Sequence, residues 1–194
     1  MEQQHEVIET VVQQTINAHE ATKQEIHKKR YQERIKVAPQ INNILASYLD
    51  RVNADHIFIG EFHNGEENIA TGIPFCKFSM TAEYFKPNHE SFIGKYINEN
   101  VTKYNILPYL LNKHLVKYEI DELRTLDYYL YLQLYSYGVK SLVLCSISDD
   151  ENFPMGFIGC ALYEDRTINT FELISCKDEV KKILMNINKN ININ

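Results

Sequence analysis

The sequence predicts an α+β fold in which one antiparallel sheet is flanked by helices. Three observations lead to this prediction: short strand-like runs separated by reversal signals, amphipathic helical repeats on either side of these runs, and a clear hairpin between Val139 and Tyr163. The expected order is helix, strand, loop, strand, helical region, helix, strand, strand, helix. A chain of 194 residues can form one domain with a sizeable core and an appendage.

Residues 1–36 are expected to form an N-terminal helical segment that differs from the rest of the chain. They contain no glycine or proline, and their acidic and basic residues balance. Because several positions on its one stripe are polar, this helix either is solvated and partly frayed or is covered by a second copy of the chain or a larger protein scaffold. The stripe has alternating four- and three-residue spacing and consists of Ile8, Val12, Thr15, His19, Thr22 and Ile26. Ile8, Val12 and Ile26 are therefore candidate interaction residues.

Pro39 is expected in the first turn of a second helix, at the start of a main domain that spans residues 37–187. A clean amphipathic repeat follows, formed by Ile41, Ile44, Leu45, Tyr48, Leu49 and Val52. Its apolar side is expected to pack on the sheet.

The stretches "HIFIGEF" (His56–Phe62) and "IPFCKFSM" (Ile73–Met80) are predicted strands. Asn64 and Gly65 tolerate positive φ and are expected to supply the chain reversal between them, with His63 at its hinge. The acidic loop that follows is expected to be exposed. The candidate interaction residues of this hairpin are His63, Asn64, Gly65, Glu66 and Glu67.

The second half of the chain is predicted to begin with short helical turns between residues 90 and 115. Asp121 is then expected to cap a helix that ends on Gly138 in the left-handed conformation. The apolar face of this helix consists of Leu123, Leu126, Leu130 and Leu134. A hairpin formed by Val139–Ile147 and Met155–Tyr163 precedes a last helix over Phe171–Met185. Residues 188–194 are of low complexity and are expected to fray.

Composition excludes several classes of function. The net charge is −6, and the only basic run is Lys28–Arg30, so no nucleic-acid partner is expected. No CxxC pair or His/Cys ladder with zinc-ligand spacing occurs, and we expect neither a metal nor a cofactor. The sequence shows no signal peptide and no run of about 18 apolar residues, which predicts a cytoplasmic protein without a membrane span.

The segment Tyr135–Leu184 resembles part of a GAF domain. GAF domains similarly end a helix on a glycine, enter a strand of the type G-V-[RK]-S, return on a strand with the pattern hGhhxh, and close with a helix introduced by a phenylalanine and acidic residues. The matching elements are Gly138–Ser141, Met155–Leu162 and Phe171–Met185, while Ala54–Phe62 matches the first strand. The resemblance covers about residues 38–187.

This resemblance implies a ligand pocket, because GAF domains bind small molecules between the sheet and the helical region after the second strand. Aromatic walls with a few polar groups suit such a pocket. Its expected lining is Phe75, Lys77, Ser79, Tyr84, Tyr96, Tyr104 and Tyr109. The alternative is that these tyrosines only pack the core. The signature of cyclic-nucleotide-binding GAF domains is not intact, and no pigment-attachment cysteine can be assigned.

The sequence allows three interpretations of the protein's function. The stretch around "FHNG" also resembles GAF-like proteins encoded by bacteriophages, so the leading interpretation is a non-enzymatic assembly module, a ring or connector component of a virion. The alternative is a small-molecule-binding regulatory GAF domain. The third is a cysteine-dependent redox enzyme using Cys145 and Cys160, although the cysteine of GAF-type reductases is replaced here by Tyr135–Gly138. No catalytic residue is assigned, since no nucleophile is fixed beside His63.

Overall fold

The structure, a computed structural model, describes residues 2–67 and 74–192. Side chains are described from 32 to 63, from 77 to 187, and at isolated positions between 13 and 29. The chain divides into two compact units: Met1–Ala38 together with Leu184–Asn194, called the terminal unit, and Pro39–Ile183, called the sheet unit.

The first helix, α1 (Glu2–Val52), continues through Pro39. The prediction that Pro39 lies in the first turn of a second helix is therefore wrong. Proline removes one helical hydrogen bond, but good helix formers on either side maintain the rest of the ladder. In the terminal unit, Thr15 and Ile16 are exposed. The side chains of Ile8, Val12 and Ile26 lie outside those described, so a self-contact or scaffold contact through this helix stays a prediction.

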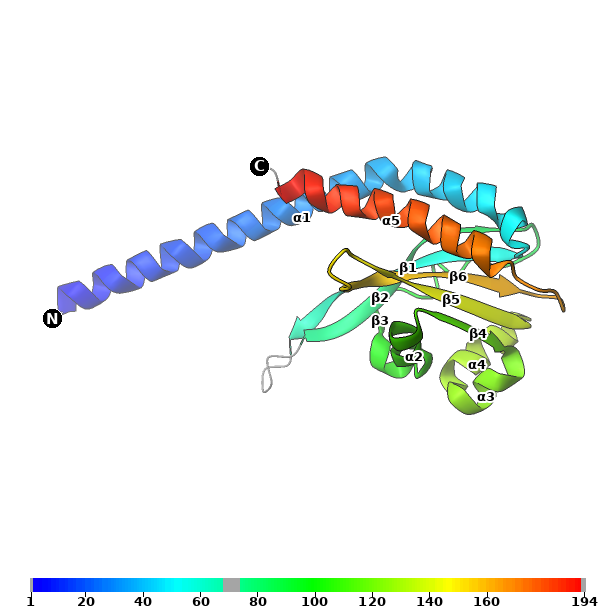
Figure 1. The fold of residues 1–194 in the computed structure, drawn as a ribbon. Helices are drawn as coiled ribbons and strands as arrows, with labels where there is room; N and C mark the ends of the chain where they lie inside the picture. The colour runs from blue at the N-terminus through cyan, green and yellow to red at the C-terminus, as the bar shows by residue number, and fades with distance from the viewer. Residues whose placement is uncertain (1, 68–73, 193–194) are drawn as a thin grey trace. The chain divides into compact units, whose positions relative to one another are not determined.

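Within the described residues, the sheet has six strands in the order β3-β2-β1-β6-β5-β4, and all neighbouring pairs are antiparallel (Figure 1). The strands are β1 (His56–Glu67), β2 (Pro74–Phe85), β3 (Glu99–Asn100), β4 (Leu115–Glu119), β5 (Ser141–Ser148) and β6 (Pro154–Leu162). The predicted fold class, an antiparallel sheet flanked by helices, is confirmed.

Helices of the sheet unit cover both faces of this sheet (Figure 1). Residues 39–52 of α1 and residues 170–183 of α5 (Thr170–Asn192) lie on one face. The opposite face carries η1 (Val101–Lys103), α2 (Ile106–Lys113), α3 (Ile120–Leu126) and α4 (Tyr128–Ser136). Because alternate strand residues point to opposite faces, β5 directs Leu142 and Leu144 toward α2–α4, and Val143 and Cys145 toward α1 and α5.

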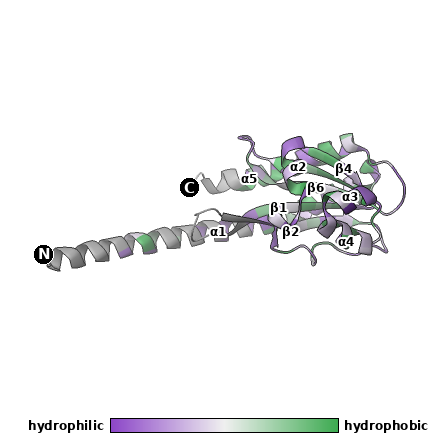
Figure 2. Ribbon diagram, turned by 90° about the horizontal axis from the view of Figure 1, so that it is seen from below, coloured by the Kyte–Doolittle hydropathy of each residue, from purple (hydrophilic) through white to green (hydrophobic). Residues whose placement is uncertain are grey.

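The hydropathy of the sheet unit follows this layering. Figure 2 shows hydrophobic residues concentrated in the strands, with hydrophilic residues in many of the connecting segments. Among the residues that the structure describes, no helix is both long and apolar enough to cross a membrane.

The first hairpin differs from its prediction because Asn64 and Gly65 belong to β1 and not to a turn. Asn64 pairs with Cys76, and Glu67 pairs with Pro74. One extra residue on β1 lies between these pairs, which makes a bulge, and glycine suits a bulge as well as it suits a turn. Residues 68–73, which connect β1 to β2, lie outside the described part. Strand β2 also runs past Met80 to Phe85, where Thr81, Tyr84 and Phe85 favour a strand.

The predicted helix from Asp121 to Gly138 is two helices, and the strand β4 before it was not predicted. Asp127 separates α3 from α4 and is only 1% exposed. Its carboxylate accepts hydrogen bonds from the backbone N–H of Leu130 at 3.0 Å and of Ile106 at 3.2 Å. One side chain therefore caps α4 and holds the first turn of α2 beside it.

The ends of this helical pair are set by local chemistry. The cap of α3 is Glu119, in a reciprocal capping box with Glu122, and not the predicted Asp121. Gly138 has a φ of 78°, and the prediction of a left-handed residue there is confirmed. The N–H of Gly138 donates to Tyr135 at 3.0 Å and that of Val139 donates to Leu134 at 3.1 Å, which is a Schellman motif.

Candidate functional site

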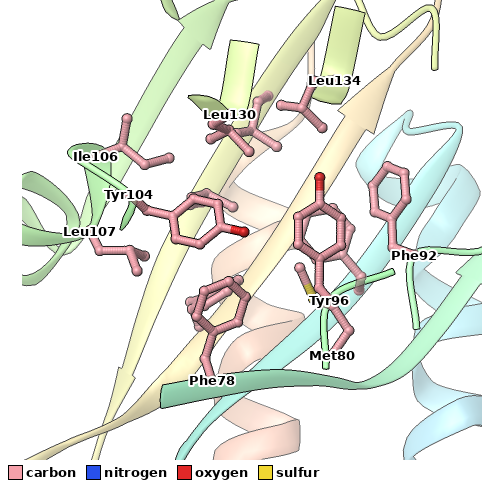
Figure 3. A pocket seen from close by; sticks show the side chains of 13 residues that line it. Phe78, Met80, Phe92, Tyr96, Tyr104, Ile106, Leu107, Leu130 and Leu134 are labelled. Carbon is pink, nitrogen blue, oxygen red and sulfur yellow. The ribbon is translucent and has the colours of Figure 1, made fainter. Parts of the chain in front are cut away.

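A cavity of about 30 Å³, called the inner cavity, lies between the sheet and helices α2 and α4 (Figure 3). Strand residues, the connection from β2 to α2, and the two helices each contribute walls. The lining is Phe58, Phe78, Met80, Phe92, Tyr96, Tyr104, Ile106, Leu107, Leu130, Leu134, Leu142, Leu144 and Phe157. Apart from two tyrosine hydroxyls, these side chains carry no nitrogen or oxygen.

The two tyrosines differ in how their hydroxyls are bonded. The hydroxyl of Tyr104 donates to the carboxylate of Glu99 at 3.1 Å. Tyr96 is 2% exposed, and its hydroxyl has no hydrogen-bond partner among the side chains that the structure describes. Burial, together with nearby tyrosines and Glu99, raises the pKa of both well above its usual range, so both are protonated donors. Figure 3 shows the two rings on the wall that faces Leu130 and Leu134.

Glu83 holds the segment that carries Tyr96. Its carboxylate accepts hydrogen bonds from the backbone N–H of Phe92 at 2.7 Å and from the hydroxyl of Ser91, and it lies 3.0 Å from Nε2 of His56. Burial alone would raise the pKa of Glu83, but these hydrogen bonds outweigh it and lower the pKa.

Two further contacts transmit this positioning to Tyr96. The His56 ring stacks on Phe92 with centroids 4.1 Å apart, and the carbonyl of Tyr96 accepts from Met80 N–H at 2.9 Å. Tyr96 therefore lies on a segment tied to both β1 and β2. Neither Glu83 nor His56 was singled out from the sequence, because Glu83 lies in the part of β2 that was not predicted.

The structure brings together only part of the predicted pocket. Tyr96 and Tyr104 line the inner cavity, whereas Tyr84 and Tyr109 are each 45% exposed and do not. Lys77 and Ser79 alternate with Phe78 and Met80, and it is the apolar pair that faces the cavity. The side chain of Phe75 lies outside those described. Whether any of these residues contacts a ligand stays a prediction.

A second hollow, called the outer groove, lies at the end of the sheet beside α2 and has a volume of about 300 Å³. Its lining is Phe62, His63, Val101, Thr102, Leu107, Pro108, Leu111, Phe153 and Pro154. His63 is in β1 and not at a hinge, and its Nε2 lies 3.0 Å from Oγ of Ser79. The side chains of Asn64, Gly65, Glu66 and Glu67 fall outside the described part.

The described cysteines do not line either hollow. Cys145, Cys160 and Cys176 are buried, and none of the three forms a disulfide. Cys145 pairs with Ile158, and Cys160 pairs with Val143, which makes the two cysteines diagonal neighbours on the face toward α5. Burial raises the pKa of all three thiols, to about 12 for Cys176. Protonated, buried thiols are poor nucleophiles, which does not favour a redox enzyme.

The side chain of Cys76, the fourth cysteine, lies outside those described. Within the described residues, no three histidine, cysteine, aspartate or glutamate side chains gather closely enough to hold a metal ion.

No protein-family model matches the sequence, and no curated protein matches it. Several solved structures, however, are similar to this chain in fold. The blue-light-absorbing form of the PixJ GAF domain from Thermosynechococcus elongatus aligns with a TM-score of 0.61 at 9% identity, over 84% of this chain and 90% of that one. A phycoerythrobilin-bound GAF domain from a cyanobacterial phytochrome aligns with a TM-score of 0.54 at 15% identity, over 90% and 96%.

A GAF domain/HD domain protein from Geobacter sulfurreducens aligns with a TM-score of 0.57 at 13% identity, over 81% of this chain and 95% of that one. The sheet unit thus has a GAF-like fold. The expectation of an assembly module in a bacteriophage virion is wrong, since the similar solved structures are GAF domains, one of them with phycoerythrobilin bound.

Proposed function

We propose that the sheet unit is a regulatory GAF-like domain that binds a small molecule at the inner cavity. One observation carries this proposal: the Tyr96 side chain lines this cavity, and its buried hydroxyl has no hydrogen-bond partner among the described residues. Leaving a buried donor unsatisfied costs about 1–3 kcal/mol. A ligand that offers an acceptor to Tyr96 would remove this cost, and its binding would be stabilised accordingly.

The walls specify the chemistry of the ligand. Because the lining is aromatic and aliphatic apart from the two hydroxyls, the buried part of the ligand is neutral and mainly apolar, with one hydrogen-bond acceptor. At about 30 Å³ the cavity is not much larger than the roughly 10–15 Å³ that one water needs. A larger ligand must therefore displace lining side chains. The described cysteines face away from the cavity, so a covalently attached bilin is not part of the proposal.

The opposite face of the sheet supplies a route for regulation. Leu144 lines the inner cavity, while the next residue, Cys145, lies on the face that α1 and α5 cover. The hydroxyl of Tyr48 on α1 donates to Glu179 on α5 at 2.6 Å, and Arg51 pairs with Glu172 at 2.6 Å. A ligand that widens the cavity would displace β5 and thereby the two helices that are tied together behind it. The proposal assigns binding, not turnover, to this site.

Thermal unfolding with a panel of neutral probes tests the proposal. Acetophenone, cyclohexanone and isopropylbenzene cover aryl and alicyclic bodies with and without an acceptor. A ligand selective for the folded state raises the melting temperature with its concentration. We expect a rise with the two ketones that is smaller in Tyr96→Phe and unchanged in Tyr84→Phe, which changes an exposed tyrosine outside the cavity. The absence of any rise in the wild-type chain across the panel would reject the proposal.

A further inference from the structure

Leu107 is the one described residue that lines both the inner cavity and the outer groove. It is 4% exposed and lies in the first turn of α2. We propose that the two hollows are halves of one ligand site, and that the Leu107 side chain sets how deeply the apolar tail of a ligand enters. This inference rests on the proposed function, because it presumes that the inner cavity is a binding site.

The two hollows complement each other in size and polarity. The inner cavity alone is small, whereas the outer groove, at about 300 Å³, reaches the lower end of the range of about 300–1,000 Å³ found for ligand sites. The groove is walled by Phe62, Leu111 and Phe153 among others, and its polar lining residues are His63 and Thr102. A ligand can therefore place its polar end in the groove and direct its tail toward Leu107.

The helix that carries Leu107 is fixed, so the partition between the hollows is a side chain. The N–H of Ile106 is bonded to Asp127, and Leu110 is fully buried. The N–H of Leu107 itself donates to the backbone carbonyl of Tyr104 at 3.3 Å, and the Tyr104 side chain also lines the inner cavity. A rotamer change of Leu107 would join the two hollows without displacing α2.

Hydrogen bonding at the groove indicates the polar end of the ligand. Oγ of Ser79 accepts from the N–H of Asn98 at 2.9 Å and lies 3.0 Å from Nε2 of His63. One nitrogen of a neutral imidazole donates and the other accepts, so Nδ1 of His63 can hydrogen-bond a ligand in either role. The hydroxyl of Thr102 donates to Asn100 at 2.8 Å, so its oxygen is an acceptor toward the groove.

The imidazole of His63 beside the Thr102 oxygen suits a head group that both donates and accepts, such as a hydroxyl or a carboxamide. Among the described residues that line the groove, none is a carboxylate or an ammonium group, so a charged head would be desolvated without a counter-charge. The ligand class that this site fits is a neutral amphipathic molecule with an aliphatic tail and a hydroxyl or amide head.

Titration of the full chain with butan-1-ol, hexan-1-ol and octan-1-ol, followed by methyl NMR, tests the inference. Burying a methylene contributes about fourfold in affinity. In the wild type we expect affinity to rise with chain length and then level off once the tail that has passed Leu107 can enter no deeper, with shifts at both Leu111 and Leu134. In Leu107→Ala the rise continues to a longer alcohol. Octanoate binds more weakly than octan-1-ol to both.

Leu111→Ala is the matched control, since Leu111 lines only the groove: it weakens all alcohols by a similar factor and leaves the levelling-off unchanged. Leu107→Val serves if the alanine variant does not fold. An unchanged chain-length limit in a folded Leu107 variant overturns the inference, as do shifts confined to Leu111 with none at Leu134. The ketone-induced stabilisation that depends on Tyr96 would then still stand, which separates this failure from a failure of the proposed function.

Discussion

Asp127 offers the sharpest test of how the site is built. Its buried carboxylate accepts from the N–H groups of Leu130 and Ile106, which begin α4 and α2. Replacing it with alanine leaves both donors without this partner. At about 1–3 kcal/mol for each of the two buried unsatisfied donors, Asp127→Ala should lower the free energy of unfolding by about 2–6 kcal/mol. That is a large fraction of the roughly 5–15 kcal/mol of an ordinary domain.

Two further variants make the test specific. Asp127→Asn keeps one acceptor oxygen and should lose about half as much as alanine. Asp121→Ala, which changes the residue that the sequence suggested as the cap, should cost about 0.5 kcal/mol or less because Asp121 is exposed. Urea unfolding at neutral pH measures all three free energies. Equal losses for Asp127→Ala and Asp121→Ala would refute the role given to Asp127.

Two other predictions concern Glu83 and Gly138. Hydrogen bonds lower the pKa of Glu83 in the folded chain, so Glu83 contributes to the free energy of unfolding above the unfolded pKa of about 4.3, and this contribution is lost as pH falls through the folded pKa. Urea unfolding from pH 7 to 3 should therefore show that Glu83→Gln loses less stability on acidification than the wild type. An unchanged dependence of stability on pH would count against this pairing. Gly138→Ala should lower the free energy of unfolding by about 1–2 kcal/mol, since φ is 78° and the added carbon meets nothing nearer than 4.0 Å. Gly94→Ala, with open space around it, should change little, and equal losses in the two variants would contradict a conformational cause.

Local patterns were sufficient to predict most of the fold. The hairpin of β5 and β6 falls within two residues of its prediction at each end, and Gly138 has the expected conformation. The leucine stripe of residues 123–134 was also found. It spans two helices because Leu123, Leu130 and Leu134 keep their spacing across the break at Asp127, so periodicity alone does not show the break.

The site was harder to predict because its walls come from segments far apart in the sequence. Phe58, Phe92 and Phe157 meet only through the strand order and the cover of the β2–β3 connection. Composition does not distinguish the buried Tyr96 from the exposed Tyr84. The predicted pocket lining used the β2 face of Lys77 and Ser79. The opposite face, with Phe78 and Met80, lines the cavity instead, because apolar side chains are the ones buried in a core.

The affinity ratio of acetophenone to isopropylbenzene tests the central claim most directly. The two probes have similar size, and only the ketone offers an acceptor to Tyr96. A net hydrogen bond contributes about 0.5–1.5 kcal/mol, so calorimetric titration of the wild-type chain should favour the ketone by about 2–13-fold. In Tyr96→Phe the ratio should fall to about one. A ratio near one in the wild type, or an unchanged preference in Tyr96→Phe, would contradict the assignment of the Tyr96 hydroxyl to a ligand.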